Sequence, residues 1–135
     1  MWTKLSQGTS LSTKFVPPTK RNALVERPEL MTRILRSRDL RLQLVCAPAG
    51  YGKTSVLEQA FVRLAEGGHK VCWVSLDESD QDLSRFILYI VDAIRQTGIR
   101  FGQGISTLLG SGISVPGDTL KTLLLNEIVG LDQEV

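Results

Sequence analysis

The chain has 135 residues, about the length of one domain, and its 42% hydrophobic and 22% charged residues are typical of an ordinary globular protein. No run of residues approaches the roughly 18 consecutive apolar positions of a membrane-spanning helix, which argues against an integral membrane protein. The formal net charge of +2 is too small to indicate a charged partner by itself.

Basic and acidic residues are unevenly distributed along the chain. Residues 1–41 contain nine Lys and Arg against three Asp and Glu, a net of +6, whereas residues 42–135 contain seven against eleven, a net of −4. We therefore expect a flexible basic N-terminal arm over residues 1–20, followed by a folded part over residues 21–135. Such an arm could contact nucleic acid or an acidic protein surface, although a solvated stretch of chain is the commoner explanation.

The start of the sequence and its cysteines predict a cytoplasmic protein. The residues Met1 to Lys4 are not followed by the apolar run of a signal peptide. Cys46 and Cys72 both fall in apolar runs that predict buried strands, and their spacing fits no metal site. Both thiols are therefore expected to act as small core side chains.

A short amphipathic helix is predicted from about Arg27 to Arg38. Pro28 and Glu29 suit the first turn of a helix, where the fixed φ of proline and an acidic charge are both favoured. Three apolar residues then fall on one face of this helix: Leu30, Ile34 and Leu35.

The most informative stretch runs from Leu42 to Ser55. The apolar residues 42–46 predict a short buried strand, and the apolar spacing of residues 54–65 predicts a helix. Between them lies a Gly-rich turn that ends in Gly52-Lys53-Thr54. A strand, a turn of this kind and a helix in that order are the context of a phosphate-binding P-loop.

The residue types of this loop suit the binding of ATP or ADP with Mg²⁺. Gly50 and Gly52 permit the backbone angles with which successive N–H groups surround a β-phosphate. Lys53 would reach the β- and γ-phosphates, and the Thr54 hydroxyl would join the coordination of Mg²⁺. The strict pattern has glycine where this chain has Ala47, a change that several P-loop families accept. The predicted phosphate-binding residues are Ala47, Pro48, Ala49, Gly50, Tyr51, Gly52, Lys53, Thr54 and Ser55.

A second buried strand is predicted over residues 70–76, after a helix stop at Gly67. Strand, helix and strand make a βαβ unit, so the predicted fold class is α/β: a P-loop NTPase three-layer sandwich with a parallel sheet. The acidic turn that follows could lie near bound phosphate or Mg²⁺. The alternative is that these acids cap the next helix, with Asp80 as the N-cap residue and Asp82 in the first turn. For Asp77, a place near the ligand and a role in capping are about equally supported.

The rest of the chain predicts two further helices. Apolar residues recur every three or four positions from Leu83 towards Gly98, and a last helix opens at Asp118 or Thr119. Between them we expect a loop of about twenty residues with a short helix near residues 106–109. A P-loop ATPase normally holds Mg²⁺ with an acid at the end of a second apolar strand, and no such strand follows. The sandwich is therefore expected to be incomplete.

Several short motifs occur in an order that resembles one protein family. They are LVERPEL from Leu24, CAPAGYGKT from Cys46 and WVSLDESD from Trp73, followed by Arg85, Phe86 and Tyr89. Across residues 13–135 the chain resembles the N-terminal part of the large ATP-binding LuxR-type transcriptional regulators, the family of the maltose regulon activator. The P-loop domain of that family belongs to the STAND class of signal-transduction NTPases.

This resemblance implies a nucleotide-driven switch. ATP with an inducer would drive self-association or association with other regulator protomers, and ADP would mark the resting form. Arg27, which precedes the first core strand, would lie near the nucleotide. DNA would be contacted only through a C-terminal helix-turn-helix domain that these 135 residues do not include. With no complete catalytic set in the chain, ATP hydrolysis is expected to be slow or absent.

Two other functions remain open from the sequence. A small P-loop nucleotide or metabolite kinase would need lid arginines, for which Arg95 and Arg100 are the candidates. A truncated chain that binds no nucleotide could instead associate with an intact regulator through the exposed edge of an incomplete sheet.

Overall fold

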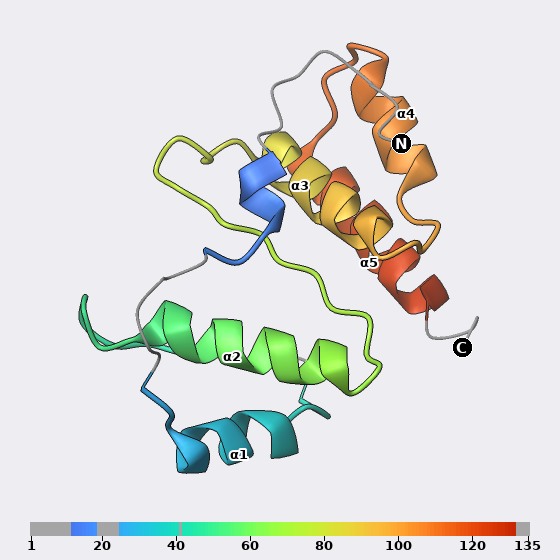
Figure 1. Cartoon of the computed structure of the whole chain (residues 1–135). Coiled ribbons are helices and arrows are strands. Elements are labelled where there is room, and N and C mark those ends of the chain that lie inside the picture. Colours follow the sequence, from blue (N-terminus) through green and yellow to red (C-terminus); the bar gives the residue numbers. More distant parts are fainter. Residues whose placement is uncertain (1–11, 19–24, 41, 132–135) are drawn as a thin grey trace. The chain divides into compact units, whose positions relative to one another are not determined.

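The computed structural model describes residues 12–18, 25–40 and 42–131 (Figure 1). These residues form two compact units. Unit 1 contains the described residues up to Val16 and from Cys72 onward, and unit 2 contains those from Pro17 to Val71. The regular elements are a short 3-10 helix and α-helices: η1 (Ser12–Phe15), α1 (Pro28–Arg36), α2 (Lys53–Glu66), α3 (Leu83–Gln96), α4 (Gln103–Gly110) and α5 (Gly117–Leu131).

The predicted α/β fold is wrong. In the described part of the chain every regular element is helical, and neither residues 42–46 nor residues 70–76 form a strand. A strand is stable only when its backbone N–H and C=O groups bond to a neighbouring strand, and among the described residues these runs have no such ladder. Leu42 and Leu44 are 81% and 82% exposed, and both cysteines are exposed as well. The structure thus overturns the P-loop NTPase sandwich, its parallel sheet and the buried cysteines.

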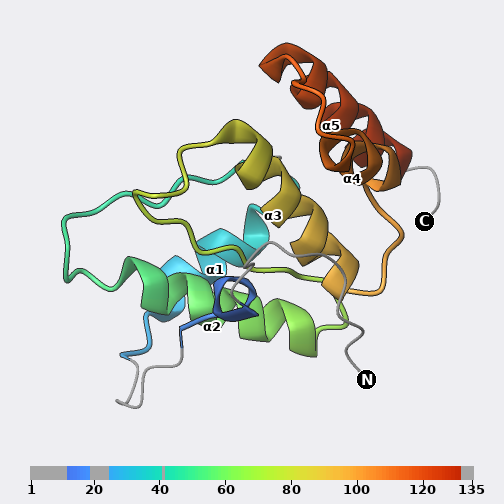
Figure 2. The ribbon, with the colours of Figure 1, turned by 90° about the horizontal axis from the view of Figure 1, so that it is seen from above.

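Unit 2 is built from α1 packed along α2 (Figures 1 and 2). Met31, Val56 and Ala60 form its buried core, and the apolar face predicted for the first helix packs around them. Beyond the end of α2, Gly68 has a φ of +84°, a left-handed angle that suits the glycine stop expected there. The helices predicted over residues 27–38 and 54–65 are therefore confirmed to within two residues at each end.

Unit 1 is a helical cluster in which α4 and α5 pack against α3 (Figures 1 and 2). The predicted helices from Leu83 and from Asp118 or Thr119 are confirmed as α3 and α5. α4 is longer than the expected turn of helix at residues 106–109, because its Ile105 side chain is drawn into the common core. That core consists of five buried side chains: Ile87, Val91, Phe101, Ile105 and Leu120.

The cap of α3 differs from the predicted one. Asp82, and not Asp80, is the N-cap residue, and its carboxylate accepts a hydrogen bond from the backbone N–H of Arg85 at 3.1 Å. Asp80 does not cap this helix because its carboxylate is bound by the Lys14 ammonium. The sequence alone places both aspartates close enough to the helix start to cap it, and the long-range contact with Lys14 decides between them.

The predicted arm over residues 1–20 lies largely outside the described residues, but residues 12–16 of its described part belong to unit 1. Phe15 of η1 is only 8% exposed. Its ring meets that of Tyr89 edge-on, with ring centres 6.0 Å apart and an interplanar angle of 76°. The backbone N–H of Ser75 also donates to the carbonyl oxygen of Lys14 at 2.8 Å. Residues 12–16 therefore belong with α3, although unit 2 separates them from it in the sequence.

Candidate functional site

The Gly-rich loop of residues 47–52 leads directly into α2 within unit 2. Gly50 and Gly52 have φ angles of +86° and +79°, which L-residues with a side chain rarely adopt. Between them, the backbone N–H of Tyr51 donates to the carbonyl oxygen of Pro48 at 3.4 Å. Gly52 is the N-cap residue of α2, and no side chain caps the helix. The first-turn N–H groups are therefore left for another acceptor.

Lys53 is the first residue of α2, and its ammonium turns back onto the loop. Its Nζ donates to the carbonyl oxygen of Ala47 and, at 3.2 Å, to that of Pro48. In the part of the chain that the structure describes, Lys53 forms no ion pair with a carboxylate. Its positive charge is solvated by backbone dipoles and is not neutralised, so it remains available to an anion.

The other residues of the predicted site are accessible. Ala47, Pro48, Ala49, Gly50, Tyr51 and Thr54 are exposed, whereas Gly52, Lys53 and Ser55 are half-buried. Thr54 lies in the first turn of α2, where its hydroxyl can reach a cation held next to a phosphate at the loop. The nine predicted residues thus form one continuous stretch at the start of a helix, and most of them face solvent.

Arg27 lies beside this loop. A β-carbon built at Gly52 would stand 3.6 Å from Nη2 and 3.9 Å from Cζ of Arg27, so the guanidinium covers one side of the glycine. Arg27 is the N-cap residue of α1, and the packing of α1 along α2 brings it there. Two cations, Arg27 and Lys53, therefore flank the N-terminus of α2, where the helix dipole is also positive.

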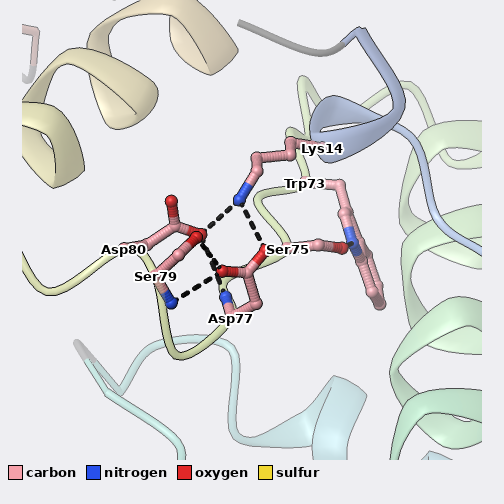
Figure 3. Close-up of polar contacts among 6 residues, drawn as sticks. All are labelled: Lys14, Trp73, Ser75, Asp77, Ser79 and Asp80. Atoms are coloured by element: carbon pink, nitrogen blue, oxygen red, sulfur yellow. Dashed lines mark hydrogen bonds and ion pairs between the residues drawn. The ribbon is translucent and has the colours of Figure 1, made fainter.

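The acidic turn after residue 76 is occupied by a lysine (Figure 3). We call Lys14, Asp77, Ser79 and Asp80 the Lys14 cluster. The Lys14 ammonium bonds to the carboxylate of Asp80 and, at 3.1 Å, to that of Asp77, and it lies 5.2 Å from the centre of the Tyr89 ring. Hydrogen bonds from Ser79 and Lys14 lower the pKa of Asp77 to about 2. The structure therefore pairs these acids with an internal cation, which would have to leave before Mg²⁺ could bind.

Lys14 has a role that sequence reasoning missed. The side chain of Asp80 is 2% exposed and that of Lys14 is 12% exposed, so this ion pair is shielded from water. Lys14 and Asp80 are 66 positions apart, and no periodicity or motif connects them. Nowhere in the described residues, the Lys14 cluster included, do three His, Cys, Asp or Glu side chains gather in a group that could hold a metal ion.

Comparison with known proteins leaves the family of this chain open. No family model matches the sequence, and no solved structure matches the chain significantly. The resemblance to LuxR-type regulators thus rests on the motifs quoted for it. Within the described residues, no helix has both the length and the apolar character to cross a membrane.

Proposed function

We propose that the loop of residues 47–55 binds the phosphates of ATP or ADP. The observation that carries this proposal is the arrangement at the start of α2. Left-handed angles at Gly50 and Gly52 lead into an uncapped helix, and the cations of Lys53 and Arg27 flank that helix end. Backbone N–H groups, a helix dipole and two cations are the elements from which anion sites at helix N-termini are built.

Each element of this arrangement would contribute to the binding of a phosphate group. A hydrogen bond to a charged group contributes about 1.5–3 kcal/mol, and the helix dipole adds about 0.3–1 kcal/mol. Lys53 would exchange the carbonyl oxygens of Ala47 and Pro48 for phosphate oxygens, which is favourable because the new acceptors are charged. A cation on the phosphates would be Mg²⁺, with the Thr54 hydroxyl as one of its ligands.

The function of this binding would be that of a switch. The loop and Arg27 supply positive charge and N–H donors but no general base for an attacking water, so we propose slow hydrolysis at most. By its resemblance, the chain would serve as part of a cytoplasmic LuxR-type transcriptional regulator that changes its association with other protomers between the ATP and ADP states. Contact with DNA would then belong to a domain outside these 135 residues.

A second candidate function is association without nucleotide. Leu42 and Leu44 are exposed by more than four-fifths, and Leu40 is 62% exposed. Exposed apolar side chains this close in sequence favour contact with another protein surface. This function and nucleotide binding make different predictions for the same titration, so one experiment separates them.

The test is isothermal titration calorimetry of the 135-residue chain with ATP and with ADP, each with and without Mg²⁺. We expect saturable binding that Lys53→Ala weakens at least about tenfold, which corresponds to about 1.4 kcal/mol. Lys70→Ala is the matched control, because Lys70 is an exposed lysine of the same unit beyond the other end of α2. A sample that is helical by circular dichroism and gives no binding heat would rule out the nucleotide proposal and leave association as the remaining function.

A further inference from the structure

Unit 1 contains a cavity of about 710 Å³ that the proposed nucleotide loop does not use. Its walls come from the end of α3, the loop that follows, the start of α4 and one residue of α5. The side chains that matter for the argument are Arg95, Ile99, Arg100, Phe101, Gln103 and Glu127. Small-molecule sites usually have volumes of about 300–1,000 Å³, so this cavity has the size of a metabolite site.

Arg95 is held in place in the wall of this cavity. Its Nε donates to the carbonyl oxygen of Phe101 at 2.7 Å, and its Nη2 reaches Oε1 of Gln103 at 3.5 Å. Phe101 is itself 3% exposed and part of the core, so the anchor of the guanidinium is rigid. These bonds use only some of the guanidinium N–H groups, and the others can bind a planar anion.

Arg100 brings a second cation to the same cavity. Neither Arg95 nor Arg100 forms an ion pair with any residue that the structure describes. Asp92 lies one helical turn before Arg95 and interacts electrostatically with it, but the two side chains are not in ion-pair contact. The cavity therefore has two cationic groups without a direct counter-ion.

Glu127 gives the same cavity a hydrogen-bond acceptor. Its Oε2 accepts a hydrogen bond from the backbone N–H of Gly102 at 3.1 Å, which fixes the carboxylate, while Oε1 has no hydrogen bond among the described residues. The carboxylate also reduces the net positive charge of the lining, which disfavours a multiply charged ligand such as ATP. Ile99, which is half-buried, adds apolar surface that a carbon skeleton can cover.

We propose that this cavity binds a small carboxylic acid that carries a neighbouring ammonium or hydroxyl group, that is, an amino acid or a hydroxy acid. The ligand carboxylate pairs with Arg95 and Arg100, and its donor group bonds to the free oxygen of Glu127. The site differs in ligand class from the loop of residues 47–55, which is built for phosphates. The proposal therefore stands or falls independently of nucleotide binding.

The test uses four probes that share a carbon skeleton, titrated by saturation-transfer NMR onto the full chain. L-leucine and leucic acid carry both the carboxylate and the donor, isocaproate lacks the donor, and isoamylamine lacks the carboxylate. We expect the first two to bind and each of the others to bind at least about tenfold more weakly, because each loses a hydrogen bond to a charged group. Inorganic phosphate, which has no carbon-bound proton to observe, serves as a fifth probe through its ability to displace L-leucine.

Three variants locate the binding. Arg100→Gln should weaken the binding of L-leucine about tenfold, and it should not unfold the protein because Arg100 is exposed. Glu127→Gln should remove the difference in affinity between L-leucine and isocaproate. Arg85→Gln, an exposed arginine at the other end of α3, should change nothing. Failure of all four carbon probes to bind, preference for phosphate, or L-leucine binding that survives Arg100→Gln would each overturn the proposal.

Discussion

Gly102 and Val91 lie so close that a β-carbon at Gly102 would stand 2.7 Å from Cγ2 of Val91. Val91 is completely buried, and Gly102 has a φ of +65° where the chain turns into α4. We expect Gly102→Ala to lower the free energy of unfolding by about 1–3 kcal/mol, because the new methyl group overpacks the core and the backbone angle becomes strained. Urea denaturation followed by circular dichroism measures this loss.

The matched control is Gly104→Ala, two residues further along in α4. A β-carbon there meets nothing within 4 Å, so the change should be neutral or should raise the free energy of unfolding by up to about 1 kcal/mol. Equal losses in the two variants would show that Gly102 is not packed against Val91.

The packing of η1 against α3 predicts the stabilities of a second pair of variants. Phe15→Ala should lower the free energy of unfolding by about 3 kcal/mol, because it removes a buried ring and its edge contact with Tyr89. Val16→Ala changes the next residue, which is 55% exposed, and should cost less than about 1 kcal/mol. If both cost the same small amount, residues 12–16 do not pack with α3 in solution.

The Lys14 cluster predicts how stability depends on pH. The pKa of Asp77 is lowered from 3.8 to about 2 by Ser79 and Lys14, and the Lys14 ammonium also lowers the pKa of Asp80. A carboxyl whose pKa is lower in the folded state stabilises the fold above its unfolded pKa and loses this contribution as the pH falls through the folded pKa. Lys14→Met should therefore lower the urea concentration at the midpoint of unfolding most near neutral pH. The difference between this midpoint and that of wild type should shrink between about pH 4 and pH 2.

Lys121→Met is the control for this pH series. Lys121 pairs with Asp118, but their side chains are 62% and 98% exposed, so this ion pair is screened by solvent. Its removal should have little effect at any pH. A Lys14→Met difference that stays constant from neutral to acidic pH would contradict the ion pairs of Lys14 with Asp77 and Asp80.

Alanine variants of two glycines, one near each end of α2, distinguish the effect of backbone strain on stability from the effect on ATP binding. Gly52 and Gly68 have φ angles of +79° and +84°, and neither has a neighbour that an added β-carbon would strike. Each change to alanine should therefore cost a similar amount of stability, about 1 kcal/mol. Only Gly52→Ala should also weaken the binding of ATP, by at least about tenfold in calorimetry, because only Gly52 lies at the proposed site. If the two variants bind ATP with equal affinity, residues 47–55 do not bind its phosphates.

The proposed role of the Thr54 hydroxyl as a ligand of Mg²⁺ leads to a further prediction. Thr54→Val keeps the shape of the side chain but removes the hydroxyl proposed to bind Mg²⁺. We expect the variant to bind ATP equally well without Mg²⁺ and to lose most of the gain in affinity that Mg²⁺ provides to wild type. Thr107→Val, an exposed threonine of α4 in unit 1, should retain the full gain. Retention of the gain in Thr54→Val would exclude Thr54 as a metal ligand.

The sequence by itself determined four of the described helices, α1, α2, α3 and α5, because helix formation depends largely on contacts within a few residues. The three- and four-residue spacing of apolar side chains in α3, Pro28 at the start of α1 and Gly67 after α2 are all local signals. The continuous candidate loop of residues 47–55 is also readable in the sequence, since its members are adjacent and its glycines do have left-handed angles.

Only the tertiary structure decided what depends on residues far apart in the chain. An apolar run such as residues 42–46 becomes a strand only if another strand bonds to its backbone, and no local pattern reports whether that partner exists. The pairing of Lys14 with Asp80, the position of Arg27 beside Gly52 and the cavity between α3, α4 and α5 have the same origin. In each case the interactions join groups that only folding brings together, so no short stretch of sequence reveals them.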